Sequence, residues 1–169
     1  AMNNRLDTYF DRIYVINLPE RTDRREEITT ALQRIGVSFA PDKVELFPAV
    51  KPKEAAGFPS PGVRGCFLSH LGALKKAAES GVSNVLILED DMEFSCIFNQ
   101  LWPDMQQQLQ DTPWDFVYFS YTHVEGSKLT TPSTKHVEMR PLDGYLRCAH
   151  AYAISRSTFA PLIQFLEAL

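Results

Sequence analysis

Apolar residues gather in short, nearly continuous runs along this chain, a pattern typical of buried strands. Residues 13–18 form the first run, and residues 84–88 form another, in which four branched aliphatic side chains follow one another. Because such a run leaves no polar face for solvent, we expect residues 84–88 at the centre of a sheet. Weaker apolar runs predict three further strands. One combines residues 37–39 and 44–47, and the other two cover residues 115–119 and 149–154.

Between these runs the apolar positions change to helical spacing. One such stripe predicts a helix over about 24–35, with Asp23 as its N-terminal cap, and a second predicts a helix over about 65–79. A third pattern predicts a helix over 159–169. The alternation of strands and helices predicts an α/β fold with a mostly parallel central sheet flanked by helices.

Two stretches have neither pattern and are expected to be loops. Five prolines lie between residues 41 and 61, and a proline inside an element removes a hydrogen-bond donor. Residues 120–147 are polar and contain both glycine and proline. This composition favours a substrate-side loop, with a short strand expected at 136–139.

Composition places the chain among ordinary globular proteins. Its 169 residues suit one domain, and we expect residues 1–169 to form it. The formal net charge of −4 supplies no broad basic field, so nucleic acid is not an expected partner. The three cysteines have neither metal-binding nor disulfide spacing, and no apolar run is long enough for a membrane span.

The acidic triplet Glu89-Asp90-Asp91 directly follows the most apolar run. In open α/β sheets ligands bind beyond the carboxyl ends of the strands, so these carboxylates are expected at a ligand site. Alternation along the strand puts Glu89 and Asp91 on one side and Asp90 on the other. Like charges so close repel one another, and Mg²⁺ or Mn²⁺ bridging to nucleotide phosphates would offset this repulsion. The alternative is three solvated turn residues.

The segment from Arg21 to Arg25 follows the first predicted strand and opens the first predicted helix. A helix N-terminus and arginine side chains both bind phosphate, so a nucleotide is the natural ligand here. We expect Asp23 to be structural, and Arg21 and Arg24 to contact the nucleotide-sugar, with Arg24 facing the ligand more than Arg25. The alternative is a simple helix start with solvated arginines.

The segment Gly62–His70 combines glycines that allow close backbone approach with Arg64, which could contact phosphate or sugar. It matches neither of the common phosphate-binding glycine motifs. Ser69 and His70 lack the surrounding glycines of a hydrolase nucleophile, so His70 is expected to be a hydrogen-bonded packing residue. Cys66 is expected to be a small buried apolar residue.

Four blocks of this sequence, taken in order, resemble glycosyltransferase family 25, the lipopolysaccharide and lipooligosaccharide sugar transferases related to procollagen galactosyltransferases. The blocks are Ile13–Arg25 (IYVINLPERTDRR), Gly62–Ala78 (GVRGCFLSHLGALKKAA), Val85–Asp91 (VLILEDD) and Cys148–Arg156 (CAHAYAISR). Together they span most of the chain. A single block would be weak support, whereas the ordered set is fairly specific.

This resemblance implies a GT-A-like nucleotide-binding fold and transfer of a hexose, galactose or glucose, from a UDP-sugar with inversion at the anomeric carbon. It also implies a Mn²⁺ or Mg²⁺ cofactor, with Asp91 and Glu89 as the metal candidates. Asp91 would bind the ion directly, and Glu89 or Asp90 would hold the ribose or a metal-bound water. The turn from Asn17 to Arg24 would line the nucleotide pocket.

An inverting transfer also needs a carboxylate or a histidine that takes the proton of the acceptor hydroxyl. The catalytic candidates in this sequence are Asp143 and His150. Members of the family usually continue through a Pro-Val-Asp-like segment that supplies an acidic residue, whereas this sequence ends at Leu169. A C-terminally truncated domain without its usual base is therefore one expectation.

The acceptor that the resemblance implies is a saccharide or glycolipid of lipopolysaccharide or lipooligosaccharide biosynthesis. The expected location is the cytoplasm, and peripheral contact with the inner membrane is compatible with it. One alternative is a catalytically inactive, glycosyltransferase-like module that binds a nucleotide or a partner, which the missing segment favours. Another is a metal-dependent nucleotidyltransferase or phosphoesterase, since an acidic triplet after a strand would serve those enzymes too.

Overall fold

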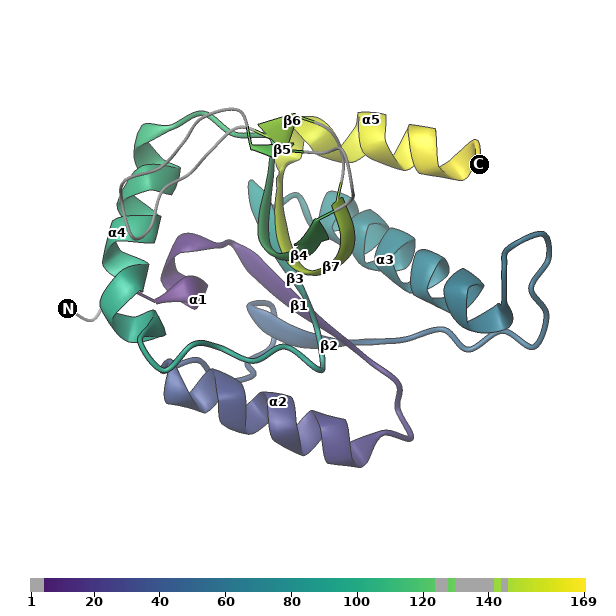
Figure 1. The fold of residues 1–169 in the computed structure, drawn as a ribbon, viewed down its shortest axis with the longest axis horizontal. Coiled ribbons are helices and arrows are strands. Elements are labelled where there is room, and N and C mark those ends of the chain that lie inside the picture. The colour runs from purple at the N-terminus through teal and green to yellow at the C-terminus, as the bar shows by residue number, and fades with distance from the viewer. Residues whose placement is uncertain (1–4, 124–127, 130–141, 144–145) are drawn as a thin grey trace.

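The computed structural model describes residues 5–123, 128–129, 142–143 and 146–169, with side chains at 5–119 and 150–169. Helices and strands alternate along most of this part of the chain (Figure 1). In chain order they are α1 (Leu6–Tyr9), β1 (Arg12–Asn17), α2 (Thr22–Arg34), β2 (Val44–Pro48), α3 (Pro61–Ser80), β3 (Asn84–Glu89), α4 (Phe98–Asp111), β4 (Phe116–His123), β5 (Lys128–Leu129), β6 (Leu142–Asp143), β7 (Leu146–Ser155) and α5 (Arg156–Glu167). The predicted α/β class is confirmed.

Five strands form one sheet in the order β2-β1-β3-β7-β4. β1 pairs in parallel with β2 and β3, whereas β7 pairs antiparallel with both β3 and β4. Four of these five strands therefore point the same way, and β7 runs against them. β3 lies at the centre, as its apolar run predicts, and β5 pairs with β6 in a separate small sheet.

Helices cover both faces of the five-stranded sheet, which gives three layers (Figure 1). On one face, Ile28 of α2 and Trp102 of α4 pack with Val15 of β1 in a buried cluster. On the other face, Leu74 of α3 and Phe159 of α5 belong to a second buried cluster. Because β1 and β3 are buried on both faces, their sequences are continuous apolar runs instead of alternating ones.

Several predicted elements lie close to their observed positions. α2 begins at Thr22 and α3 at Pro61, each a little earlier than predicted. α3 begins early because Ser60 Oγ accepts a hydrogen bond from the backbone N–H of Val63 (3.1 Å), and proline is well tolerated in the first turn. Gly81 ends α3 in the left-handed conformation (φ 69°), which favours glycine.

The helices α1 and α4 are absent from the predicted elements. Pro103 lies inside α4, and a proline in the sequence suggests a helix end. The apolar side chains Phe98, Trp102 and Leu109 nevertheless follow helical spacing and pack in the core. The predicted second strand is also too long, because β2 does not include residues 37–39.

The strand expected at 136–139 lies outside the described residues. Among the helices that the structure describes, none combines the length and the apolar character that a membrane span requires. The candidate site lies where strands of the sheet end and the helices beside them begin.

Candidate functional site

Residues from three neighbouring strands meet at one edge of the sheet. β1 and β3 are parallel, so their carboxyl ends carry Asn17 and the triplet Glu89–Asp91 to the same edge. β7 runs the other way and enters the sheet there, because Ala151 pairs with Leu88 and His150 precedes it. The antiparallel strand thus brings a histidine to the acidic triplet.

Asp90 connects the turn after β3 to the end of β1. Asn17 Nδ2 donates a hydrogen bond to Asp90 Oδ2 (2.9 Å), and Arg24 Nη1 pairs with Asp90 Oδ1 (3.3 Å). Asn17 is only 3% exposed, so its amide needs such a partner. Nδ2 of Asn17 also donates to the carbonyl oxygen of Arg21 (3.3 Å). Four residues expected to bind the nucleotide therefore form one connected group.

Glu89 points to the other side of the strand, as the alternation predicts. Its Oε1 accepts a hydrogen bond from His70 Nε2 (3.1 Å), and its Oε2 accepts one from His150 Nδ1 (3.0 Å). Asp91 lies on this side too, with Oδ1 3.6 Å from His150 Nδ1. The three carboxylates are thus divided, with Asp90 in one group and Glu89 and Asp91 in the other.

The histidines and Glu89 shift one another's pKa. Burial lowers the pKa of His70, but hydrogen bonds and charge from Cys66 and Glu89 outweigh burial and raise it to about 9. Burial raises the pKa of Glu89, but the hydrogen bonds from His70 and His150 outweigh it and lower the pKa below its usual value. Burial raises the pKa of Tyr152, and nearby negative charge adds to this. The raised pKa favours the charged form of His70, in which one ring nitrogen donates to Glu89 and the other to Tyr152.

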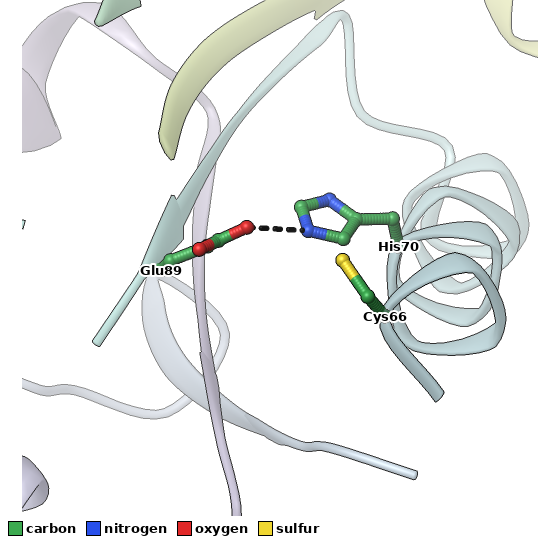
Figure 2. A group of neighbouring side chains, drawn as sticks. All are labelled: Cys66, His70 and Glu89. Atoms are coloured by element: carbon green, nitrogen blue, oxygen red, sulfur yellow. Dashed lines mark hydrogen bonds and ion pairs between the residues drawn. The ribbon is translucent and has the colours of Figure 1, made fainter. Parts of the chain in front are cut away.

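Cys66 lies one helical turn before His70 on α3, so both side chains project from one face of the helix. Figure 2 shows the sulfur of Cys66 and the carboxylate of Glu89 both facing the His70 ring. The expectation that Cys66 is buried is wrong, because this residue is exposed. The buried face of α3 instead follows Gly65 and Ser69. The prediction of a hydrogen-bonded His70 is confirmed.

A cleft of about 460 Å³ opens beside this group, lined by the end of β1, the segment after β2 and the first turns of α3. Arg21, Arg24 and Lys51 contribute cationic side chains to its wall, and Glu89 and Asp90 contribute carboxylates. The remaining lining is largely apolar. This mixture suits a ligand that has both an anionic part and a flat apolar part.

A second cleft, of about 890 Å³, lies on the other side of Asp90, between α2 and the segment after β3. Arg34 is the only cation among its described lining residues. The carboxylates of this lining are Asp23, Glu26, Glu27, Asp90, Asp91 and Glu93. Such a lining repels a phosphate group.

The start of α2 differs from the predicted one. Arg21 is the residue before the helix, and no side-chain hydrogen bond caps it, so the prediction of Asp23 as the cap is wrong. Asp23 lies inside the first turn, where Arg21 Nε and Nη2 donate to its two oxygens, both at 3.0 Å. These bonds and the backbone N–H of Arg24 lower the pKa of Asp23 to about 2.

The contacts of the described residues leave the roles of two other predicted site residues, Arg64 and Asp143, untested. Arg64 Nη1 donates to the carbonyl oxygen of Glu54 (3.1 Å), and Arg64 is not among the described lining residues of the smaller cleft. Asp143 belongs to β6, and its side chain lies outside the described part of the chain. Ligand contact by Arg64 and catalysis by Asp143 stay predictions.

Two sets of described side chains have donor atoms close enough together to hold a cation. In each set the donor atoms lie within 4.8 Å of one another. One set is Glu89, Asp91 and His150, and the other is Cys66, His70 and Glu89. Glu89 belongs to both, through its two oxygens.

Two residues of this region were not expected from the sequence. Tyr152 holds the His70 ring through a hydrogen bond to Nδ1, and its signal is its place two residues after His150 on the same face of a strand. Lys51 lines the smaller cleft but lies in the proline-rich stretch, where no periodic pattern indicates a direction.

The sequence of the chain also matches known proteins. The model of a family described as glycosyltransferase family 25 (LPS biosynthesis protein) matches residues 10–169. A Drosophila melanogaster protein named "Glycosyltransferase 25 family member" is 29% identical over 167 residues, which cover 86% of this chain and 26% of that protein. "Procollagen galactosyltransferase 1" of Danio rerio is 30% identical over 130 residues, covering 64% and 21%.

A human protein named "Inactive glycosyltransferase 25 family member 3" is 29% identical over 168 residues, covering 86% of this chain and 27% of that protein. The chain spans about a quarter of the length of the curated relatives that it matches. These relatives include proteins named as transferases and proteins named as inactive.

Proposed function

Because the chain belongs to glycosyltransferase family 25, we propose that it transfers a hexose from a UDP-sugar to a saccharide acceptor with inversion at the anomeric carbon. The observation that carries this proposal is the group at the carboxyl ends of β1 and β3, where carboxylates, an arginine and a histidine meet beside one cleft. Such a transfer needs positive charge for the diphosphate and a base for the acceptor, and this group contains candidates for both.

The cleft of about 460 Å³ is the proposed donor site. Arg24 and Lys51 suit the diphosphate, because cationic side chains form strong hydrogen bonds with phosphate oxygens. The apolar surface of Leu18 and Val50 in the same lining suits the faces of the base and the sugar. The larger cleft is a poorer alternative for a free phosphate, because six carboxylates and a single cation, Arg34, stand in its described lining. Glu89 lines the smaller cleft and Asp91 the larger one, so the cation proposed below would lie between the two clefts.

Glu89 and Asp91 are the proposed ligands of a Mn²⁺ or Mg²⁺ ion. Their oxygens lie within 4.8 Å of each other, and carboxylate oxygens are the donors that these cations prefer. When bound, such an ion offsets the negative charge that develops on the leaving diphosphate. The protein holds the two carboxylates on one side of the chain and turns Asp90 to the other side.

His150 is the proposed base. Its Nδ1 donates to Glu89 Oε2 (3.0 Å), which leaves the lone pair of the neutral ring on Nε2. Nε2 has no hydrogen-bond partner among the described side chains, and the imidazole is 36% exposed, so an acceptor can approach it. In the proposed step the acceptor oxygen attacks the anomeric carbon, its proton passes to Nε2, and the bond to the diphosphate breaks.

The transferred sugar and the acceptor are further parts of the proposal. The name of the Danio rerio relative supports galactose, with glucose as the alternative. The description of the family supports an acceptor in lipopolysaccharide biosynthesis. The proposed acceptor is a saccharide or a glycolipid of lipopolysaccharide or lipooligosaccharide biosynthesis. A cytoplasmic location with peripheral contact at the inner membrane would go with such an acceptor.

Calorimetric titration with UDP, with and without Mn²⁺, tests the donor site. We expect metal-dependent binding that Asp91→Ala weakens at least tenfold, or about 1.4 kcal/mol. Glu93→Ala is the matched control, because Glu93 is a nearby carboxylate that does not belong to the donor set of Glu89, Asp91 and His150. Equal affinity of the wild type and Asp91→Ala would remove Asp91 from the metal site.

A second function, nucleotide binding without transfer, is favoured by the relatives that are named inactive. Incubation with UDP-galactose or UDP-glucose, followed by measurement of released UDP, separates the two functions. For a transferase we expect release that His150→Ala lowers about a hundredfold or more, while UDP binding is kept. UDP binding without release from either donor would favour the inactive module.

A further inference from the structure

We propose that Cys66, His70 and Glu89 form a binding site for a zinc ion, distinct from the cation site proposed at Glu89 and Asp91. The donors are a thiol sulfur, an imidazole nitrogen and a carboxylate oxygen, and they lie within 4.8 Å of one another. Thiolate and imidazole donors suit zinc, whereas Mg²⁺ and Mn²⁺ prefer oxygen. Zinc binding of this kind does not depend on the proposed transferase activity.

The two ligands from α3 are arranged for a shared ion. Cys66 and His70 are four residues apart, so their side chains lie on one helix face and approach the end of β3 together (Figure 2). Zinc bonds of about 2.0–2.3 Å place ligand atoms roughly 3.5 Å apart. His70 Nε2 and Glu89 Oε1 are already 3.1 Å apart, and a donor at the 4.8 Å limit needs to move closer by about 1 Å. The Cys66 side chain can make this adjustment by rotation, because the residue is exposed.

The neighbours of these ligands already hold them in place. A histidine that binds a metal usually donates its other ring N–H to a nearby group, which fixes the ring. His70 Nδ1 has such a contact with the hydroxyl of Tyr152, a residue that is 8% exposed. His70 Nε2 is therefore the nitrogen that faces Glu89 (3.1 Å). Glu89 is held in turn through its other oxygen by His150.

Three protein ligands leave one position of a tetrahedral zinc ion open to water or an anion. Cys66, His70 and Glu89 all line the cleft of about 460 Å³, so an ion can enter from solvent. Binding removes the proton of the Cys66 thiol and the proton that His70 carries on Nε2, and both pass to solvent. Because Glu89 is shared, zinc here would also compete with the Mn²⁺-dependent UDP binding proposed above, and this last consequence rests on the proposed function.

Cobalt(II) is a suitable probe, because it occupies zinc sites and shows sulfur-to-cobalt charge-transfer absorption when a thiolate is a ligand. The chain is freed of metal with a chelator, titrated with Co²⁺ and then with Zn²⁺. We expect a charge-transfer band that Zn²⁺ removes and that a roughly tenfold excess of Mg²⁺ does not. Cys66→Ser should abolish the band and weaken Zn²⁺ binding at least tenfold. Cys96→Ser, which changes the other exposed free cysteine among the described side chains, should keep both.

Asp91→Asn distinguishes this site from the proposed donor-site cation. Zinc binding that survives Asp91→Asn supports the thiol site, and zinc binding that survives Cys66→Ser but not Asp91→Asn overturns it. Alkylation of the wild type provides a test without substitution, since Zn²⁺ should slow the reaction of Cys66 and leave Cys96 unchanged, as measured by peptide mass spectrometry. Equal Cys66 alkylation rates with and without Zn²⁺ would also overturn the proposal.

Discussion

Asp90 and Asp91 are neighbours in one turn, yet their contacts predict unequal contributions to stability. Asp90→Ala removes the acceptor of Asn17 Nδ2 (2.9 Å) and the partner of Arg24 Nη1 (3.3 Å). Asn17 is 3% exposed, so its amide would stay buried with one longer contact, to the carbonyl oxygen of Arg21 (3.3 Å). The Asp91 side chain is 43% exposed, and its removal leaves no comparable buried donor among the described residues.

The magnitude follows from these contacts. Loss of a hydrogen bond to a charged group costs about 1.5–3 kcal/mol, and the ion pair adds about 0.2–1 kcal/mol because the Arg24 side chain is 36% exposed. Relief of repulsion from Glu89 and Asp91 offsets part of this, so we expect about 2 kcal/mol for Asp90→Ala. Asp90→Asn keeps an acceptor oxygen for Asn17 and should cost about 1 kcal/mol.

Urea denaturation followed by tryptophan fluorescence measures these losses, because Trp102 is 1% exposed in the core and reports unfolding. Asp91→Asn is the matched control and is expected to stay within about 0.5 kcal/mol of the wild type. Equal losses for Asp90→Ala and Asp91→Asn would refute the division of the triplet into Asp90, which is bonded to Asn17 and Arg24, and the more exposed Asp91. A loss below about 0.5 kcal/mol for Asp90→Ala would do the same.

Gly65→Ala should destabilise the protein by about 2 kcal/mol, because the added Cβ would lie 2.5 Å from the carbonyl oxygen of Val50. Thermal denaturation measures this, and Gly62→Ala, whose nearest new contact is 3.7 Å, should instead be neutral or stabilising; equal effects would contradict the close approach. The pKa of Asp23 is expected at about 2, and Arg21→Ala should raise it toward 3.8, as carboxyl-carbon chemical shifts against pH would report. Because folding lowers this pKa, the stability from the pair is present above the unfolded-state pKa and is lost as pH falls through about 2. An unchanged titration in Arg21→Ala would exclude the pair as the cause.

The strands that position the site could be predicted because burial on both faces leaves a continuous apolar run. The runs at 13–18 and 84–88 correspond to β1 and β3, and parallel pairing then brings their carboxyl ends together. The alternation that separates Asp90 from Glu89 and Asp91 follows from the same geometry and is confirmed.

Other features depend on tertiary contacts that no local pattern contains. In the sequence Pro103 suggests a helix end, although it lies inside α4. The start of α2 has an Arg21–Asp23 pair instead of a side-chain cap. The exposure of Cys66 depends on which face of α3 meets the sheet, and the stripe through Gly65 and Ser69 takes that face. Cysteine, glycine and serine are all small, so the residue types alone do not indicate which of these two faces of α3 is buried.

Because β7 is held by antiparallel pairing with β3, the position of His150 does not depend on the length of the chain that precedes β7. The pairing of Ala151 with Leu88 sets the imidazole beside Glu89 whatever number of residues connects β4 to β7. The imidazole therefore keeps its place beside Glu89 through strand pairing alone. A single antiparallel strand thus joins a histidine to an acidic turn whose Glu89 lies 61 residues earlier in the chain.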